Sequence, residues 1–192
     1  GEASGLAARL QLPSGARMDL INDLAALGYS LPVLSPGQLS SLRAGAQQGH
    51  QSLVVGIGTG FNVSLVVGDQ TAGAELGHAS LPASVFARLE ASLGHRPEEF
   101  PSVESLFSGH GLVRFHQALS GRAIAGGAQL MEEYLADQNS AAAKTVVTWA
   151  ELLGQFAANL IPTYMPGQGL FFAGSVARGV LGSPAQAYFL DG

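Results

Sequence analysis

The chain has 192 residues, of which 47% are hydrophobic and 12% are charged, and its formal net charge is −5. This composition excludes an intrinsically disordered chain and allows one domain with a substantial core, or slightly more. Lys144 is the only lysine and the arginines are scattered, so no basic stripe is available to bind a nucleic acid. The absence of cysteine excludes disulfides, thiolate zinc sites and a cysteine nucleophile.

No apolar stretch in the sequence is long enough to cross a membrane. The opening segment, GEASGLAARLQLPSG, starts with small and polar residues and lacks the marks of a secretory signal peptide. It also lacks an initiator methionine, as a segment from within a longer protein would. We therefore expect a cytoplasmic protein, and the lack of cysteine fits a reducing compartment.

In chain order, the first elements are expected to be a strand and a broken helix. Residues 16–24 are predicted to form a short strand that ends at Asn22 and Asp23, before a helical turn broken at Pro32. Residues 35–50 are rich in Ser, Gly and Gln, which favours a loop or a short helix. The pattern then predicts, in order, a hairpin over 53–68, a third strand over about 74–81, and a helix capped by Ser84 that runs to Leu93.

The second half of the chain is expected to be mainly helical. The strongest helical pattern covers 140–161, and Pro162 and Pro166 are predicted to end that helix. A buried strand over 169–174 follows and leads into another helix. Before the long helix, the pattern predicts a short helix after Pro101, an interruption at Gly109 and Gly111, a second helix through Leu119, and a further helix over 122–138. This order predicts a mixed α/β fold with an antiparallel hairpin.

The glycine-rich stretch LVVGIGTGFNVSLVVG, residues 53–68, is the first candidate for a ligand site. Its spacing is G-x-G-x-G and a strand pattern follows it, whereas a dinucleotide fingerprint needs G-x-G-x-x-G before a helix. The sequence also lacks a G-x-x-x-x-G-K-[ST] phosphate loop. Two interpretations stay open: a tight turn whose amides and Thr59 hydroxyl bind an anion, or an ordinary hairpin.

A few polar side chains stand out, each with a structural alternative. Asp23 follows an apolar stretch and could face a ligand or cap a turn. Glu75 and His78 could share a site if the chain bends at Gly77, and otherwise they are incidental surface residues. Glu104 could bind a ligand or simply be a solvated carboxylate at a helix start. The histidines show no metal-ligand spacing, and His110 and His116 are interpreted as structural.

The order of these motifs is more specific than any of them alone. From about Asp19 to Arg178, the chain resembles the bacterial glucokinases, which are ATP-dependent hexose kinases of the actin-like ATPase superfamily. The segments that carry the resemblance are INDLAALGYSLPVL, similar to N-D-F-x-A-x-A-x-x-x-P-x-L; VVGIGTGFNVSLV, similar to G-x-G-T-G-L-G-V; GAELGHASL, similar to G-E-x-G-H; ESLFSGHGLVRFHQAL, similar to E-R-V-L-S-G-P-G-L; and LLGQFAANLIPTYMPGQGLFFAGSVAR, similar to the segment adjoining the adenosine.

The resemblance implies that ATP, with Mg²⁺, phosphorylates the 6-hydroxyl of glucose at the entry to glycolysis. Asp23 would be the base that takes the proton of that hydroxyl. The resemblance implies that the sugar ligands besides Asp23 are Asn22, Glu75, His78 and Glu104. It implies that the nucleotide is bound by Gly56, Gly58, Thr59 and Gly60 at the phosphates and by Gly174 and Ser175 beside the adenosine.

The resemblance also implies the large domain of an actin-like ATPase, hexokinase-type fold, in which helices pack on a mixed sheet with an antiparallel hairpin. Residues 1–33 would be a remnant of the small N-terminal domain and the hinge, and residues 34–192 would be the large α/β domain. A homodimer is expected on the same grounds, with a sugar and ATP as ligands and neither nucleic acid nor membrane as a partner.

The sequence departs from the family pattern at several positions. Phe61-Asn62 stands where Leu-Gly is usual, and Ser175 stands where a second glycine is expected. His110 replaces a proline, and Leu76 occupies a position that is commonly glycine. The family's D-x-G-G-T motif, with its Mg²⁺-linked aspartate, is not found, so we expect the Mg²⁺ ligand outside this chain. This chain alone is then expected to phosphorylate glucose poorly or not at all.

Two alternatives to a glucokinase stay open. One is a kinase for another hexose or an amino sugar. The other is a non-catalytic sugar-binding or regulatory relative, which Ser175 and the missing motif favour, whereas the glycines at 56–60 and Asp23 favour a kinase.

Overall fold

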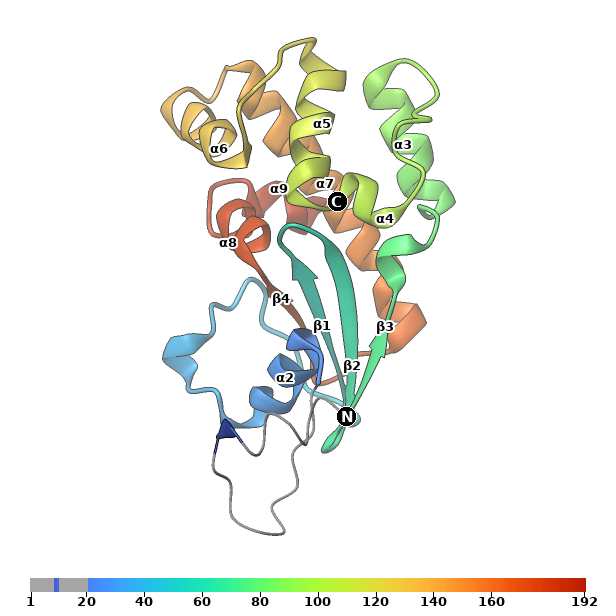
Figure 1. Ribbon diagram of the computed structural model, residues 1–192, viewed down its shortest axis with the longest axis vertical. Coiled ribbons are helices and arrows are strands. Elements are labelled where there is room, and N and C mark those ends of the chain that lie inside the picture. Colours follow the sequence, from blue (N-terminus) through green and yellow to red (C-terminus); the bar gives the residue numbers. More distant parts are fainter. Residues whose placement is uncertain (1–8, 11–20) are drawn as a thin grey trace.

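The sheet is built around the hairpin that the glycine-rich stretch predicts. The computed structural model describes residues 9–10 and 21–192. Strands β1 (Gln51–Ile57) and β2 (Phe61–Val67) are antiparallel. β3 (Gln70–Ala74) pairs with β2, and β4 (Gly169–Ala173) runs parallel to β1, which gives the order β3-β2-β1-β4 (Figure 1). This mixed sheet confirms the predicted α/β class.

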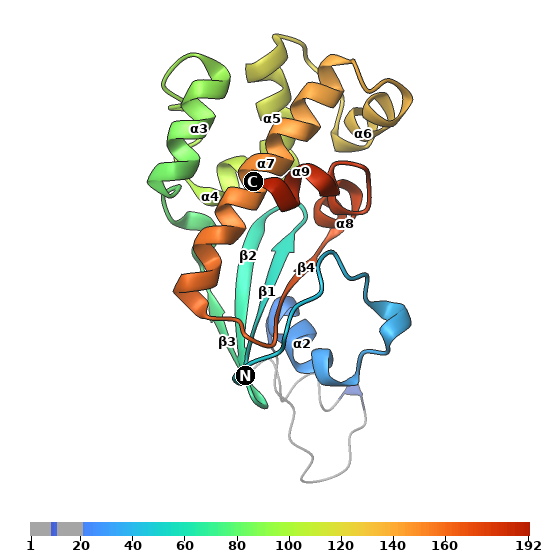
Figure 2. The same ribbon diagram turned by 180° about the vertical axis from the view of Figure 1, so that it is seen from behind.

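The hairpin separates two layers of helix, because successive side chains of a strand point to opposite faces. Leu53, Val55 and Ile57 of β1 are fully buried and belong to the main apolar core, together with residues of α7 (Ala141–Tyr164). Helix α2 (Asp23–Ser30) packs on the other face. It lies in front of the sheet in Figure 1, whereas α7 lies in front in Figure 2.

The direction of α2 follows from two close approaches to the sheet. A Cβ atom on Gly56 would lie 2.5 Å from Leu24 Cδ2, so the first turn of α2 sits over the end of β1. A Cβ atom on Gly28 would lie 2.9 Å from Val66 Cγ2 and 3.0 Å from Thr71 Cγ2, so the last turn sits over the opposite end of the sheet. The N-terminus of α2 therefore points toward the turn between β1 and β2.

An aromatic cluster fixes the short helix α4 (Val103–Leu106) between the sheet and α7. The ring of Phe107 lies 5.1 Å from that of Phe156 and 5.6 Å from that of Trp149, measured between centroids. The Trp149 indole Nε1–H donates to the carbonyl of Leu106 at 3.0 Å, which satisfies its one polar group inside the core. The C-terminal end of α4 is thereby anchored in the core, and Glu104 in its first turn lies against Gly60 of the turn between β1 and β2.

The predicted strand over 16–24 needs correction. Residues 16–20 lie outside the described residues, and Asp23 begins a helix instead of ending a strand. The Asn22 side chain accepts the backbone N–H of Leu24 at 2.9 Å, which is the usual way for an asparagine to cap a helix N-terminus. Capping by Asn22 is thus the local cause of the helix that follows.

The third strand was predicted at about 74–81, but β3 ends at Ala74. Gly68, with φ 60°, turns the chain directly after β2, so pairing with β2 resumes early, at Gln70. Residues 76–78 then form a single 3₁₀ turn around Gly77, where a Cβ atom would lie 2.3 Å from the Phe61 carbonyl oxygen. The chain bends there because it passes so close to β2.

Three helix boundaries also differ from the predictions. Helix α3 (Ala83–Leu93) begins after Pro82, so Ser84 lies inside the helix and does not cap it. Helix α5 (Gly109–Ser120) starts at the first of the glycines predicted to interrupt it, with Ser108 as its cap. Pro162 lies inside the last turn of α7, where it is exposed, and water can satisfy the carbonyl that its ring leaves unbonded.

The remaining elements agree broadly with the expected pattern. Short 3₁₀ turns are the only regular structure between α2 and β1, as expected for residues 35–50. None of the described helices is both long and apolar enough to span a bilayer. The other described elements are the 3₁₀ turns Leu31–Val33, Pro36–Gln38 and Leu76–His78 and the helices α6 (Gly127–Ala136), α8 (Ser175–Leu181) and α9 (Gln186–Asp191).

Candidate functional site

The glycine turn lies at the edge of the sheet where β1 and β4 both end. Gly58 N–H donates to the carbonyl of Gly60 at 3.0 Å and closes the turn, which leaves Thr59 exposed at its tip. Because β4 is parallel to β1, its last residues reach the same edge, and Gly174 lies beside Ile57. A Cβ atom on Gly174 would lie 2.2 Å from the Ile57 carbonyl oxygen, and its φ of 95° also requires glycine.

Two helix N-termini meet at this turn. Gly109, the first residue of α5, donates its N–H to the carbonyl of Gly58 at 2.8 Å. A Cβ atom on Gly109 would lie 3.5 Å from Val176 Cγ2, near the start of α8, so the two helices begin side by side. The Gly109 and Gly111 N–H groups are already bonded, to the Gly58 carbonyl and to Ser108 Oγ, so what these helix starts offer an anion such as a phosphate is mainly their partial positive charge.

Glu104 joins the turn from the first turn of α4. Its Oε2 accepts the backbone N–H of Phe61 at 2.8 Å, and the side chain is half-buried. A Cβ atom on Gly60 would lie 2.5 Å from the same oxygen, so the carboxylate occupies the space that any larger residue at position 60 would need. One of the predicted sugar ligands therefore contacts the predicted phosphate turn directly.

Glu75 and His78 come together on the 3₁₀ turn after β3. His78 Nε2 lies 3.9 Å from Glu75 Oε2, and their side chains are 76% and 77% exposed, respectively. The bend that Gly77 imposes explains why residues three apart share one side of the chain. The same glycine lies 3.3 Å, measured from its Cβ position, from Glu104 Cβ, so the pair stands next to Glu104.

Asn22 and Asp23 belong to the opposite layer and lie near the same end of the sheet. They precede Leu24, whose side chain covers Gly56, and Gly56 pairs with Asn62 in the hairpin. Both side chains are exposed, and Asp23 Oδ1 accepts the backbone N–H of Leu24 at 2.9 Å. Among the described residues, no hydrogen bond or ion pair joins Asp23 to the other predicted sugar ligands, so its role as base stays a prediction.

The predicted nucleotide residues divide into two groups. Gly56 is covered by Leu24 and serves the packing of α2 on the sheet. Thr59 and Ser175 are exposed, and a Cβ atom on Gly58 would meet no atom within 4 Å, so this side of the turn is open. The Gly58 amide is already used by the Gly60 carbonyl, which leaves the Thr59 hydroxyl and the remaining amides of the turn for a ligand.

Asn62 is a polar residue of the site that sequence reasoning did not select. Its Nδ2 donates to Glu75 Oε2 at 3.0 Å, and its Oδ1 accepts the backbone N–H groups of Val63 at 2.9 Å and Leu76 at 3.2 Å. The sequence did offer one signal that could have pointed to Asn62: it stands where the family pattern usually has a glycine after the phosphate turn.

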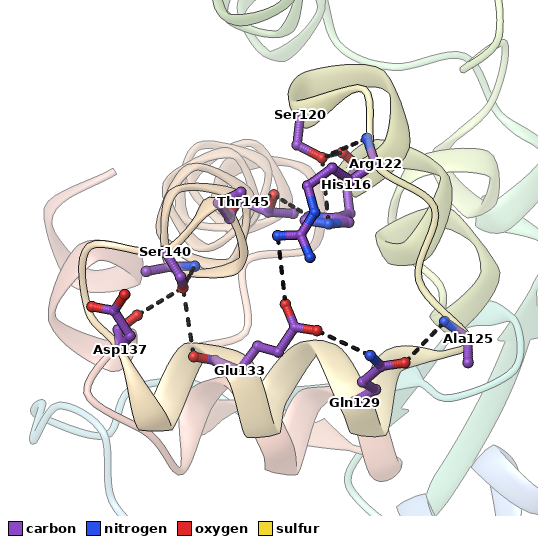
Figure 3. A network of polar contacts seen from close by, with 11 residues as sticks. His116, Ser120, Arg122, Ala125, Gln129, Glu133, Asp137, Ser140 and Thr145 are labelled. Atoms are coloured by element: carbon purple, nitrogen blue, oxygen red, sulfur yellow. Dashed lines mark hydrogen bonds and ion pairs between the residues drawn. The ribbon is translucent and has the colours of Figure 1, made fainter.

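His116 lies away from this site and has the structural role predicted for it. It is buried between α5 and α7, where its Nδ1 lies 2.8 Å from Thr145 Oγ1 and its Nε2 lies 3.3 Å from Ser120 Oγ (Figure 3). Burial lowers the pKa of His116 from 6.5, and the nearby Arg122 guanidinium lowers it further, against an opposing effect of Glu133.

Solved structures that share this fold include sugar kinases. A glucokinase from an Antarctic psychrotroph matches with a TM-score of 0.75 and 27% identity, over 89% of this chain and 56% of that one. A ROK family glucokinase from Streptomyces griseus, solved in complex with glucose and AMPPNP, matches with a TM-score of 0.61 and 19% identity, over 97% of this chain and 61% of that one. This second likeness shows the fold alone.

The chain belongs to the glucokinase family, because the family model described as Glucokinase matches residues 2–191. The glucokinase of Aromatoleum aromaticum is 32% identical to it over 177 residues, which make up 84% of this chain and 52% of that relative. The chain thus spans about half the length of the curated relatives it matches, as the value of 52% illustrates.

Proposed function

We propose that the protein to which this chain belongs transfers the γ-phosphoryl group of ATP to the 6-hydroxyl of glucose. The observation that carries this proposal is the bond from Phe61 N–H to Glu104 Oε2 at 2.8 Å. It brings a carboxylate suited to a sugar hydroxyl against a turn suited to phosphates, and a phosphoryl transfer needs its two substrates at such a junction. Membership of the glucokinase family supports the same reaction.

The sugar would be bound by residues that accept and donate hydrogen bonds in fixed geometry. Each hydroxyl of a hexose both donates and accepts, and carboxylates, an amide and an imidazole can match several hydroxyls at once. Glu75, His78 and Glu104 stand together beside the glycine turn, and Asn22 would approach from the cap of α2. These side chains form the proposed glucose site.

ATP would be bound where the turn meets the two helix N-termini. Thr59 offers a hydroxyl at the tip of the turn, and the starts of α5 and α8 offer partial positive charge to the phosphates. Gly174 and Ser175 would lie beside the adenosine. The AMPPNP bound to the Streptomyces griseus glucokinase is consistent with this use of the fold.

The proposed reaction is an in-line displacement. Asp23 accepts the proton of the 6-hydroxyl, whose oxygen forms a bond to the γ-phosphorus while the bond to the bridging oxygen breaks and ADP leaves. The products are glucose 6-phosphate and ADP, and the proton remains on Asp23 until solvent takes it. Closure of the site would exclude water, which otherwise competes with the sugar as acceptor.

Mg²⁺ would accompany the nucleotide. The described residues gather no group of three or more acidic or histidine side chains that could hold a metal ion. In kinases this ion is held largely by substrate phosphates and water, with one or two carboxylates. An ion that arrives with ATP would neutralise phosphate charge during transfer, and its protein ligand is expected outside this chain.

The domain assignment and the setting belong to the same proposal. Residues 1–33 would be a remnant of the small N-terminal domain and the hinge, residues 34–192 would be the large α/β domain, and the protein would act as a cytoplasmic homodimer. In support, the N-terminus of α2 is directed at the glycine turn, where a hinge segment would bring the base to the phosphates.

Two observations favour an alternative, a sugar-binding relative without kinase activity. The Gly58 amide already donates to Gly60, and Ser175 brings a side chain to the first residue of α8. Both features reduce the space and the donors available to a nucleotide. A kinase for another hexose remains compatible with the same sugar residues.

The test compares ligand binding with turnover in the full reading frame that contains residues 1–192. Calorimetry with glucose and with AMPPNP separately, and a coupled ADP-release assay over a panel of hexoses, distinguish the three readings. Glucose-dependent ADP release supports the proposal, whereas glucose binding without nucleotide binding supports the non-catalytic relative. The 192-residue chain alone is expected to bind glucose with little or no turnover, and full turnover by it would refute that expectation.

A further inference from the structure

We propose that Asn62 is a positioning residue that holds the carboxylate of Glu75 for the sugar and ties it to the phosphate turn. This inference rests on the proposed function, because Glu75 needs a fixed orientation only if it binds a substrate. It assigns a role to one of the positions at which this chain departs from the glucokinase pattern.

The first two residues of β2 each hold one of the proposed sugar carboxylates. Phe61 donates its backbone N–H to Glu104 at 2.8 Å, and Asn62 donates its side-chain amide to Glu75 at 3.0 Å. The first bond uses the main chain and is therefore open to any residue type other than proline. The second bond needs a side chain with a donor, which a glycine at this position lacks.

Asparagine satisfies three neighbours at once. Its Oδ1 accepts from the N–H groups of Val63 and Leu76, and these bonds orient the amide so that Nδ2 faces Glu75. A donor aimed at an ionised carboxylate makes a charge-assisted hydrogen bond, which is stronger than a neutral one. The side chain thus bridges β2 to the segment that carries Glu75.

The arrangement leaves one carboxylate oxygen of Glu75 for a ligand. Oε2 accepts from Asn62 and faces His78 at 3.9 Å, whereas Oε1 has no hydrogen bond to any described residue. Holding Oε2 therefore restrains the carboxylate and leaves Oε1 available to accept from a sugar hydroxyl. Since the Glu75 side chain is 77% exposed, little else restrains it, and the loss of this bond would let the carboxylate turn freely.

The decisive test compares Asn62→Asp with Asn62→Ala in the full-length protein. Aspartate keeps Oδ1 for the amides of Val63 and Leu76, but it replaces the donor with a charged oxygen that repels Glu75. A positioning role predicts that Asn62→Asp raises the glucose KM about tenfold, with kcat changed less than about threefold, and that it does so at least as strongly as Asn62→Ala. Asn139→Asp, on the exposed turn between α6 and α7, is the matched control and should leave both constants unchanged.

A purely structural role predicts the opposite order, because Asn62→Ala removes the acceptor for both amides and Asn62→Asp removes neither. Amide hydrogen exchange reports on this directly: Leu76 should exchange faster in Asn62→Ala than in Asn62→Asp. If the glucose KM follows the exchange rate of Leu76 and not the loss of the donor, the inference is overturned.

A double variant tests the link between the two side chains. In Asn62→Asp with Glu75→Gln, the glutamine amide can donate to the new carboxylate, so the bond returns with its polarity reversed. The glucose KM of the double variant should be no higher than that of Glu75→Gln alone, because the two changes act on one interaction. KM effects that simply multiply would show that the residues act independently and would overturn the inference.

Failure of the proposed function has a different signature. If the unmodified protein neither binds nor phosphorylates any hexose, the function is wrong, whatever the variants do. If it phosphorylates glucose and Asn62→Asp leaves the glucose KM unchanged, the function stands and only the role of Asn62 is wrong.

Discussion

The carboxylate of Glu104 and the backbone N–H of Phe61 form the bond that joins the two halves of the proposed site. The two residues are far apart in sequence, in α4 and at the start of β2, and Oε2 accepts the N–H at 2.8 Å. The aromatic rings of Phe61 and Phe107 lie 6.5 Å apart in the core beneath this bond. The position of Glu104 is therefore set by packing on one side and by the glycine turn on the other.

Gly60→Ala should disturb glucose binding more than stability. The new Cβ atom would lie 2.5 Å from Glu104 Oε2, and the end of a flexible side chain can move away. We expect about 1 kcal/mol of lost stability from the broken bond and about a tenfold weaker glucose affinity. Chemical denaturation and calorimetry measure the two effects. Gly73→Ala, where a Cβ atom meets nothing within 4 Å, is the control. Unchanged glucose affinity in Gly60→Ala would argue against Glu104 as a sugar ligand.

Asp23→Asn should abolish turnover and preserve glucose binding. Asparagine keeps an oxygen for the Leu24 N–H, so the first turn of α2 should persist, but it cannot take the proton of the 6-hydroxyl. We expect kcat to fall by about 10²–10⁴-fold, with the glucose Kd changed by less than about threefold. Asp69→Asn, in the exposed turn after β2, serves as the control. Turnover close to normal in Asp23→Asn would remove the base from the mechanism.

Gly174→Ala should unfold the edge of the sheet where the adenosine is proposed to bind. Its φ of 95° disfavours alanine, and the Cβ atom would lie 2.2 Å from the Ile57 carbonyl, which is main chain and cannot swing away. We expect a loss of about 2–4 kcal/mol in the free energy of unfolding. Gly179→Ala, later in α8 and open to solvent, should instead be neutral or slightly stabilising. Equal stability of the two variants would contradict the geometry of this edge.

His116 should make stability fall as the pH falls. Burial lowers its pKa below 6.5 in the folded chain, so the unfolded chain binds the proton more readily. The unfolded state gains protons first, so this contribution is complete above pH 6.5 and is lost as the pH falls toward the folded pKa.

The hydroxyl oxygens of Thr145 and Ser120 face the two ring nitrogens of His116 in Figure 3. Thr145 Oγ1 donates to the Ala141 carbonyl at 2.9 Å, so it accepts from His116 Nδ1–H in the neutral ring. When the pH is lowered from about 7.5 to about 5.5, the free energy of unfolding should drop less in the His116→Gln variant than in the unmodified chain. Urea denaturation at the two pH values measures this difference. His50→Gln, at an exposed position, should keep the original pH dependence. Identical slopes in all three proteins would rule out His116 as the titrating group.

The hairpin and the order of the motifs were predictable because they depend on local patterns. Alternating apolar residues and closely spaced glycines predict β1, β2 and their turn, and the structure confirms them. The short β3 was misplaced, because its start depends on how Gly68 reverses the chain and its end on how closely Gly77 passes Phe61. Contacts of this kind between distant segments leave no periodic signal.

The prediction of a strand where α2 begins was wrong for a local reason. The apolar residues before Asn22 predicted a strand, but an asparagine directly before an acidic residue is also a common helix start, and the cap prevails from Asp23 onward. Asn62 was missed because its importance depends on a partner that follows a further strand. Its hydrogen bond to Glu75 could be anticipated only once the register of β2 and β3 was known.

The alternation of β2 makes the site sensitive to a change that alters no functional residue. Gly56 pairs with Asn62 and Ile57 with Phe61, so Asn62 turns to the layer of α2 while Phe61 enters the core beside α7. Inserting one residue into the glycine turn, or slipping the strand by one position, would exchange these two faces. The amide would then be buried in the aromatic cluster and the phenyl ring would be placed beside Glu75. The length of the three-residue turn thus decides which face of the sheet carries the polar residues of the site and which face packs into the apolar core.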